Sequence, residues 1–389
     1  MEQTENPALL TELVYLSIKD VGRAIDMKKL ESPAIHSRLS GKKRRALLPK
    51  RKDTPTSLAL PQPVWFDFEE VPAEGLGLVY PTAKVYNDGA VTIVLRGQGR
   101  FHLDELGLLS QSPLIQSQGY TYSFDDFADR LFGRLMDVIG EAIIDSVERS
   151  RIQEEKYLAY CFLEYPEQPG IFVQKHRQQL ASLLIGEYES ATLHESQIQT
   201  ALAWPFSYHL EDLAVFDMDH CIIFDPHRDY EDILLIIENA IYRLLELRAL
   251  DRLLDLRLEE AERDLTVYGI EKSKKGKEQI KLRGRTPQRK FARIQALRFE
   301  ALFILENLEN SSKIIGDYFL EQIYTRLCEI FNTDGWSRSV ERRLDVLSSV
   351  YEMVKNDSAE QRTLVLEIVF IVVCVVLPLI QIWQALIIK

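Results

Sequence analysis

The C-terminal end of the chain carries the sequence feature that most limits the possible fold. Residues 368–380 (IVFIVVCVVLPLI) are thirteen apolar residues in a row, and extension to Ile388 adds only Gln381 and Gln384 as polar interruptions. The resulting 21 residues are long enough to cross a bilayer, which takes about 20 residues of helix. The alternative is a buried terminal helix, but a helix in a soluble domain usually keeps one polar face. The sequence therefore predicts one C-terminal transmembrane helix.

The residues around this segment suit the two membrane interfaces. Trp383 and Lys389 fit the far interface, Glu367 marks the near one, and Pro378 is expected to bend the helix. The N-terminus has neither an apolar signal core nor an Arg-rich leader composition. We therefore expect a tail-anchored protein of the cytoplasmic (inner) membrane, with the N-terminal bulk in the cytoplasm.

The charge of the chain is unevenly distributed. The formal net charge is −12, which argues against a general nucleic-acid binder and against specific DNA binding. Residues 42–52 nevertheless carry seven basic residues and no acid, and residues 272–293 carry ten basic residues and one acid. These segments are either solvated loops or contacts for the phosphates of anionic lipid, RNA or a ribosome. The candidate anion contacts are Lys42, Lys43, Arg44, Arg45, Lys274, Lys275, Lys277, Arg283 and Arg285.

The four cysteines give no sign of a metal site or a disulfide framework. Cys161, Cys221, Cys328 and Cys374 are far apart in the sequence and show no Cys-x-x-Cys spacing. This pattern favours a reducing compartment. We expect neither a metal nor a cofactor.

Residues 1–228 are predicted to form an α/β or α+β domain. Residues 83–96 contain Asn87-Asp88-Gly89 between two β-branched runs, which predicts a hairpin. Helical periodicity extends over residues 124–150, and residues 213–226 predict a second hairpin. Short strands and helices that alternate in this way are typical of one mixed domain.

Residues 229–358 are predicted to form a helical coiled-coil stalk, followed by the membrane anchor at 359–389. Apolar residues recur at spacings of three and four along three long helices, expected near 230–265, 287–331 and from 339. Narrow apolar stripes commonly pair with a second copy. We therefore expect a homo-oligomer that assembles through the stalk. The predicted fold class is an α+β N-terminal domain, a coiled-coil stalk and one transmembrane helix.

The stretch FDMDH offers an enzymatic alternative. Asp217 and Asp219 follow an apolar run, as the nucleophile and the general acid do in metal-dependent phosphohydrolases of the haloacid dehalogenase type. Such enzymes also need parallel strands and helices downstream, whereas one short strand and then long helices follow here. The other interpretation is a polar hairpin turn. The residue types alone also allow a metal site formed by Asp217, Asp219, His220, Asp225, His227 and Asp229, although such clusters are more often solvated acids.

The C-terminal half resembles a known family. Residues 233–255, 296–327 and 336–354, followed by the terminal apolar segment, are similar to the RMND (required for meiotic nuclear division) family of membrane-anchored proteins, in its bacterial type. The hairpin LEDLAVFDMDHCIIFDP resembles the strand pair that precedes the helices in that family. The resemblance covers about residues 205–380. It implies a structural tether, which in eukaryotic members supports mitochondrial translation, and it carries over no catalytic residue.

These observations favour a membrane-tethered, self-associating scaffold or adaptor without catalytic activity. The first alternative is an oligomeric ion channel or transporter in which Gln381, Gln384 and Glu367 of several copies line a pore. The second is the phosphohydrolase that uses Asp217 and Asp219.

If the basic segments bind phosphate groups, the binding will weaken steeply as salt rises, because counterions are released on association. Replacement of Lys274, Lys275 and Lys277 by Glu should then abolish binding to RNA or anionic vesicles. The measurement is the affinity as a function of salt concentration. A salt dependence that is the same in the triple variant and the parent chain would contradict this interpretation.

Overall fold

The computed structural model describes most of the N-terminal two thirds of the chain and part of the rest. The described residues are 8–30, 42–45, 63–109, 111–147, 152–187, 193–274, 295–299, 301–302, 305, 317–349, 352 and 370. The chain divides into two compact units. The first contains Met1–Ala249 and Leu308–Gly335, and the second contains Leu250–Asn307 and Trp336–Lys389.

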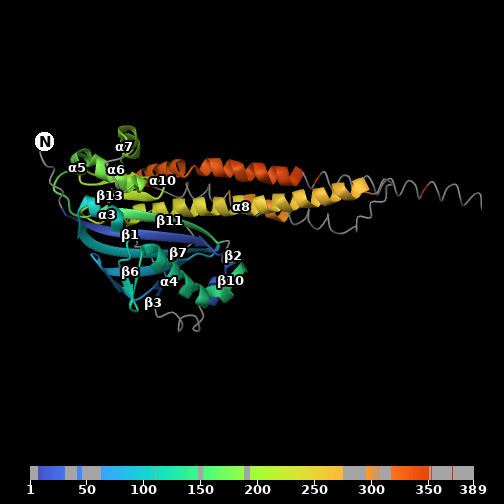
Figure 1. Cartoon of the computed structure of the whole chain (residues 1–389), viewed down its shortest axis with the longest axis horizontal. Helices are drawn as coiled ribbons and strands as arrows, with labels where there is room; N and C mark the ends of the chain where they lie inside the picture. The colour runs from blue at the N-terminus through green and yellow to red at the C-terminus, as the bar shows by residue number, and fades with distance from the viewer. Residues whose placement is uncertain are drawn as a thin grey trace, which may run out of the picture. The chain divides into compact units, whose positions relative to one another are not determined.

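The first unit is built on an 11-stranded sheet within the described residues, with the strand order β12-β13-β11-β1-β7-β6-β5-β8-β9 and with β3 and β4 joined to β6 (Figure 1). A separate pair consists of β10 and β2. The strands are β1 Leu9–Asp20, β2 Gly22–Ile25, β3 Lys42–Arg45, β4 Val64–Asp67, β5 Val71–Ala73, β6 Gly77–Val85, β7 Ala90–Phe101, β8 Ile115–Ser117, β9 Tyr120–Tyr122, β10 Ile143–Ser146, β11 Gln153–Phe162, β12 Leu213–Phe216 and β13 His220–Phe224. The helices are α1 Met27–Leu30, α3 Leu103–Leu109, α4 Phe124–Ile139, α5 Pro169–Lys175, α6 Arg177–Ile185, α7 Glu195–Ala201, α8 Glu231–Lys274 and α10 Tyr318–Ile330.

Strand β1 is the centre of the sheet. It pairs antiparallel with β7 along its whole length and with β11 from Thr11 onward. The pair β11–β13 is parallel, and β12–β13 is an antiparallel hairpin. Strand β1 is almost entirely buried, because both of its faces are covered. Its polar residues Thr11, Ser17 and Lys19 are buried together with the apolar ones.

Alternation along the strands assigns the two faces of the sheet. On β1, Tyr15 and Lys19 contact α4, whereas Glu12 accepts a hydrogen bond from Tyr230, the residue before α8. On β11, Lys156 reaches α4 and Glu155 pairs with Arg248 of α8. Successive side chains of a strand point to opposite faces. The sheet therefore lies between α4 on one face and the first part of α8 on the other (Figure 1).

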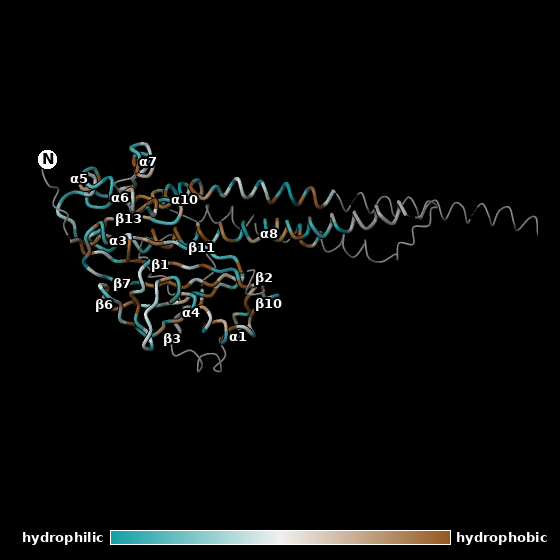
Figure 2. Tube along the Cα trace, in the orientation of Figure 1, coloured by the Kyte–Doolittle hydropathy of each residue, from teal (hydrophilic) through white to brown (hydrophobic). Residues whose placement is uncertain are grey.

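A buried ion pair fixes α8 to the sheet. The Lys84 ammonium of β6 contacts the Glu238 carboxylate of α8, and both residues are buried. Tyr86 donates a second hydrogen bond to Glu238 at 2.7 Å, and the Lys84 ammonium lies 4.6 Å from the ring centroid of Trp65. The Tyr86 ring also stacks on Tyr242, one turn further along α8. Apolar and hydrophilic residues alternate from turn to turn along this helix (Figure 2).

The second unit, taken by itself, contains three helical stretches, each of which buries part of its apolar side chains. They are α8 from Leu250 onward, residues 295–299 with their neighbours 301–302, and residues 336–349. The buried apolar residues are Leu250, Leu254, Ala301, Leu305, Val340, Leu344 and Leu347. Arg343 contacts both Asp251, at 2.9 Å, and Asp255. Part of the predicted stripes is thus covered within one chain, whereas Leu258 and Leu297 are half-buried. Self-association through the stripes stays a prediction.

Several predicted elements are confirmed and others need correction. The hairpins β6–β7 and β12–β13 are present at the expected residues. The helix expected over 124–150 ends at Ile139 and gives way to β10, because Ile143 and Ile144 pair with β2. The helix expected over 287–331 does not continue through Asp317, which has extended backbone angles and caps α10. Residues 42–45, expected in irregular chain, form β3.

The predicted fold class is wrong in its C-terminal part. In the part of the chain that the structure describes, no helix has the length and apolarity needed to cross a membrane. The transmembrane helix, the tail anchor and the inner-membrane location are therefore not supported. The segment 368–388 itself lies outside the described residues apart from Phe370. What the structure contains is a mixed α/β N-terminal domain with a large sheet. The channel alternative depended on the span and is not carried further.

The Lys84–Glu238 pair generates a stability prediction. Glu238→Gln should lower the free energy of unfolding by about 3–5 kcal/mol, because the Lys84 charge is left buried without a carboxylate. The double variant Lys84→Met/Glu238→Leu is the matched control and should lose much less, since no buried charge remains. Urea unfolding of the full chain, followed by circular dichroism, measures both. Equal losses in the two variants would contradict this account.

Candidate functional site

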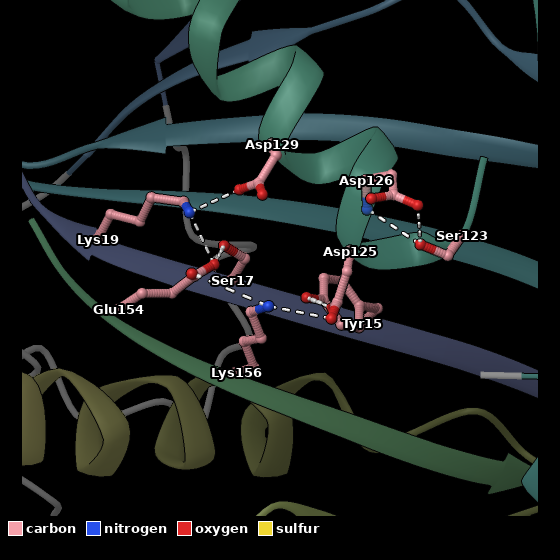
Figure 3. Close-up of polar contacts among 9 residues, drawn as sticks. All are labelled: Tyr15, Ser17, Lys19, Ser123, Asp125, Asp126, Asp129, Glu154 and Lys156. Carbon is pink, nitrogen blue, oxygen red and sulfur yellow. Dashed lines mark hydrogen bonds and ion pairs between the residues drawn. The ribbon is translucent and has the colours of Figure 1, made fainter. Parts of the chain in front are cut away.

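A polar network connects β1 and β11 to α4 (Figure 3). The Lys19 ammonium is buried and lies 2.7 Å from Asp129 Oδ1 and 2.8 Å from Glu154 Oε1. Ser17 donates to the same Glu154 oxygen at 2.8 Å. The Lys19 ammonium also lies 5.0 Å from the ring centroid of Phe132 on α4. Both contacts to α4, Asp129 and Phe132, lie on the helix face that meets the sheet.

A second branch of the network joins Tyr15 to Asp125 and Lys156 (Figure 3). The Tyr15 hydroxyl donates a short hydrogen bond to Asp125 Oδ1, and the Lys156 ammonium lies 3.0 Å from Asp125 Oδ2. Burial, together with the hydrogen bond to Asp125, raises the pKa of Tyr15 far above its usual value. Burial lowers the pKa of Lys156, but its contacts with Asp125 and Glu154 outweigh this and raise it. Ser123 begins α4 by accepting from the Asp126 N–H at 3.1 Å.

This network positions α4 rather than presenting a reactive group. A nucleophile must reach its substrate, whereas Ser17 is fully buried and the Lys19 ammonium is held by two carboxylates. The ion pairs and the Ser123 cap instead fix the angle and the register of α4 on the sheet. The part of α4 beyond the network lines a pocket.

The pocket lies between α4, β5 with the residues before it, and the β8–β9 hairpin, and its volume is about 690 Å³. We call it the α4–β9 pocket. Its residues are Phe68, Glu69, Val71, Pro72, Gln116, Ser117, Gln118, Gly119, Tyr120, Thr121, Phe127, Leu131 and Arg134. The lining combines apolar and aromatic residues with about as many polar ones, and the volume is within the range of about 300–1,000 Å³ that is usual for ligand pockets.

Two arginines of α4, one turn apart, brace the walls of this pocket. Arg130 donates short hydrogen bonds to the Tyr122 hydroxyl and to Gln118 Oε1, and it lies 5.2 Å from the Tyr122 ring centroid. The Arg134 guanidinium lies 6.0 Å from the ring centroid of Phe68. The β8–β9 hairpin is therefore attached to α4 by side-chain contacts as well as by the chain.

The outer edge of β9 includes Thr121, which also lines the pocket. Its two-residue turn, Gln118-Gly119, has φ values of 52° and 80°, which identify the type of tight turn that suits a hairpin. Ser117 and Tyr120 close this turn and exchange hydrogen bonds, so the next residue, Thr121, points its N–H and C=O outward. Among the described residues, no strand pairs with the outer edge of β9. Within the part of the chain that the structure describes, the N–H and C=O of Thr121 thus have no strand partner, and this residue also lines the pocket.

A cluster of carboxyl groups lies on the α8 side of the sheet. Burial raises the pKa of Asp20 to about 6, and the neighbouring Asp88 raises it further, against the effect of the Gly22 N–H. Burial also raises the pKa of Asp88 and, well above its usual value, that of Glu246 on α8. Within the described residues, no three His, Cys, Asp or Glu side chains are placed to bind a metal ion. Burial thus favours the protonated form of all three carboxyl groups.

The hairpin β6–β7 is packed tightly at this cluster. Its turn contains Asp88 and Gly89, and Gly89 has a φ of +100°. A Cβ atom at Gly89 would lie 1.7 Å from the Gly22 carbonyl oxygen, so only glycine fits this approach. Val21 donates to the Gly89 carbonyl at 3.0 Å. This contact holds Asp20 and Asp88 near each other.

The structure places Asp217 and Asp219 in the turn of the β12–β13 hairpin. Asp217 accepts from the Met218 N–H at 2.8 Å, and its own N–H donates to the His220 carbonyl at 2.8 Å. The Tyr157 hydroxyl of β11 lies within hydrogen-bond distance of the carbonyl oxygens of both Asp217 and His220. The two carboxylates are therefore part of a polar turn beside an antiparallel pair. This geometry is unlike a phosphohydrolase centre at the end of a parallel sheet.

The remaining predicted contacts are mostly outside the described residues. Of the candidate anion contacts, Lys42, Lys43, Arg44 and Arg45 form β3, and Lys274 is the last residue of α8. Lys275, Lys277, Arg283 and Arg285 lie outside the described residues. The predicted anchor residues Glu367, Pro378, Trp383 and Lys389 also lie outside them.

Two cysteines are fully buried on neighbouring strands of the sheet. Cys161 of β11 and Cys221 of β13 are fully buried and free. Burial raises the pKa of both thiols far above the usual value. Neither is placed to act as a nucleophile or as a metal ligand.

The sequence analysis missed the α4–β9 pocket. The turn signal was present, since Gln118-Gly119 separates the short runs Ile115–Ser117 and Tyr120–Tyr122. Its strands are only three residues long, so alternation within them carries little information. Nothing in the sequence shows that this hairpin meets α4.

The fold and site define a mixed α/β protein with a large, mainly antiparallel sheet, a balanced polar network and a partly apolar pocket. The chain belongs to the family described as "Uncharacterized protein MJ0711, N-terminal domain", which matches residues 11–231. It is 29% identical over 214 residues to the protein named "Uncharacterized protein MJ0711" of Methanocaldococcus jannaschii. That match covers 55% of this chain and 61% of the relative, so the chain spans about three fifths of the relative's length. No solved structure matches the chain significantly. The RMND family is not among these matches.

Asp20 generates a prediction about pH. Because its folded-state pKa is raised from 3.8 to about 6, the stability that it contributes at acid pH is lost as the pH rises through this range. Asp20→Asn should therefore raise the thermal midpoint at about pH 8 and change it little at about pH 4. The amide oxygen can still accept the Gly22 hydrogen bond. An equal shift at both pH values would contradict the prediction.

Proposed function

We propose that the chain is a non-catalytic adaptor that binds an extended segment of a partner protein at the α4–β9 pocket. The carrying observation is the outward N–H and C=O of Thr121 at the border of the pocket. An extended polypeptide supplies the complementary acceptor and donor and adds one strand to a sheet edge. A small rigid ligand seldom supplies both at strand spacing.

The pocket supports specificity for one side chain of the added strand. Alternate side chains of that strand would lie beside Tyr120 of β9, which is exposed, lines the pocket and packs on the Tyr122 ring. Main-chain hydrogen bonds contribute affinity in this binding mode, and such pockets contribute specificity. The occupant is therefore an extended segment with an apolar side chain at the position that enters the pocket.

The polar network around Lys19 supports this proposal because it makes the site rigid. Two ion pairs between α4 and the central strands, together with the Arg130 contacts to the hairpin, hold both walls of the pocket in place without a bound partner. A preformed site lowers the entropy cost of binding. This is the role of the cluster in Figure 3 under the proposal.

The resemblance of residues 205–380 to the RMND family is consistent with this proposal. The tethering role that it implies agrees with a binding protein and gives no catalytic residue. The match to residues 11–231 includes the whole α4–β9 pocket, so members of that family would share the site.

A single substitution at the strand edge tests the proposal. Thr121→Pro removes the outward N–H and is tolerated on an edge strand, where no ladder hydrogen bond is lost. Thr121→Ala keeps the N–H and is the matched control. We expect short random peptides displayed on phage, selected on the full-length protein, to share one apolar position. Thr121→Pro should weaken their binding by about tenfold, the equivalent of roughly one to two hydrogen bonds.

The affinities are measured by fluorescence polarisation, with the thermal midpoints of both variants as a check on folding. Peptides that bind Thr121→Pro as well as Thr121→Ala would overturn strand addition. Failure to enrich any peptide would overturn the proposal as a whole.

A further inference from the structure

A loop next to the edge of the sheet exposes large apolar side chains. In the loop 202–212, between α7 and β12, Trp204 is 60% exposed, Tyr208 68% and Leu210 81%. Tyr318, the first residue of α10, is 74% exposed. The Tyr208 ring packs against Phe319 of α10 at 5.5 Å between centroids, which joins the loop to the helix. We call Trp204, Tyr208, Leu210, Tyr318 and Phe319 the aromatic patch.

The loop is held in place by its own hydrogen bonds. The Asp212 carboxylate accepts from the Tyr208 N–H at 2.7 Å and from the His209 N–H at 3.0 Å. Phe206 and Ala214 exchange backbone hydrogen bonds of 2.8 and 2.7 Å, which attach the loop to β12. The exposed side chains are thus presented on an ordered backbone. A surface of this kind binds a partner without a large ordering cost.

The helix side of the patch is equally ordered. Asp317 caps α10 by accepting from the N–H groups of Phe319 and Leu320 at 2.8 and 3.1 Å. The Arg326 guanidinium lies 5.4 Å from the ring centroid of Trp204 and pairs with Glu329 at 3.0 Å. Arg326 therefore orients Trp204, and its charge is already paired.

The surroundings of the patch are acidic. The loop 202–212, the turn 217–220 and residues 317–330 contain seven acidic residues, one arginine and no lysine. Asp217 interacts electrostatically with Arg326, so the FDMDH turn borders the patch. Leu210 precedes Glu211 and Asp212, and Tyr318 follows Asp317. Aromatic anchors inside a charged rim are typical of protein interfaces.

We propose that the aromatic patch is a second interaction surface, which binds a basic segment with apolar side chains on another polypeptide. The aromatic residues and Leu210 supply the apolar contact, and the acidic rim selects lysine and arginine over acidic sequences. The inference stands apart from the α4–β9 pocket, because it uses different elements and a different kind of recognition. An adaptor with both surfaces would join two partners.

The experiment places a photo-reactive benzoylphenylalanine at Tyr208 of the full-length protein in its native cells, and at Tyr80, an exposed tyrosine of β6, as the control. The expected product is a cross-link from position 208, absent from position 80, to a lysine- or arginine-rich peptide of a different protein. That peptide, made synthetically, should bind the full-length protein more weakly as salt rises.

Two variants connect the cross-link to the patch. Trp204→Ser and Tyr318→Ser should each weaken binding of the peptide by about tenfold, whereas Tyr80→Ser and Thr121→Pro should leave it unchanged. Thermal midpoints equal to that of the parent chain show that the variants are folded. A cross-link to a second copy of this chain, to an acidic peptide, or to nothing would overturn the proposal. Unchanged affinity in both patch variants would do the same. Loss of binding in Thr121→Pro alone would instead assign the peptide to the pocket.

Discussion

The buried contact between Lys84 and Glu238 is the interaction on which the arrangement of the first unit depends. Ion pairs also join α8 to the sheet at Arg248–Glu155 and Arg96–Glu231, but in the Lys84–Glu238 contact both residues are buried. A buried ion pair of this kind adds little stability compared with an apolar contact. It does, however, require the two side chains to meet, because a buried charge without its partner is strongly destabilising. Tyr86 and Trp65 restrict the pair further. The pair therefore fixes the register of α8 against β6. It also fixes the position of Glu246, the member of the carboxyl cluster that lies about two turns further along α8.

Opposite faces of the sheet use different means to hold their helices. On the α8 face, separate ion pairs such as Lys84–Glu238 and Arg248–Glu155 accompany a carboxyl cluster, whereas on the α4 face the charges form one network that extends from buried Lys19 to exposed Asp129. Both arrangements use side chains that alternate along β1 and β11. The two proposed binding surfaces lie at short connecting segments, the β8–β9 hairpin and the loop 202–212. Each is held by hydrogen bonds, so neither needs to fold on contact with a partner.

Local sequence signals predicted the local structure well. Asn87-Asp88-Gly89 and the run from Ala214 to Pro226 both indicated hairpins that are present, because turn chemistry and β-branched runs act over a few residues. Pairings between distant segments were not predictable: Ile143 and Ile144 leave a helical pattern to pair with β2, and β8–β9 meets α4. The terminal apolar run misled the fold class, since hydropathy alone does not tell a span from other apolar segments. The pocket escaped prediction because its walls come from three separate parts of the chain.

The burial of Cys161 and Cys221 gives the molecule an internal reporter. Only the thiolate reacts with alkylating reagents, and burial in the centre of the sheet suppresses both the thiolate and access to it. Each sulfur becomes reactive when its strand separates from its neighbours. The labelling rate of these two positions therefore measures how often the middle of the sheet opens, in the unmodified chain and under native conditions. Motions of the surface loops leave this labelling rate unchanged, so the rate reports the opening of the strands around Cys161 and Cys221.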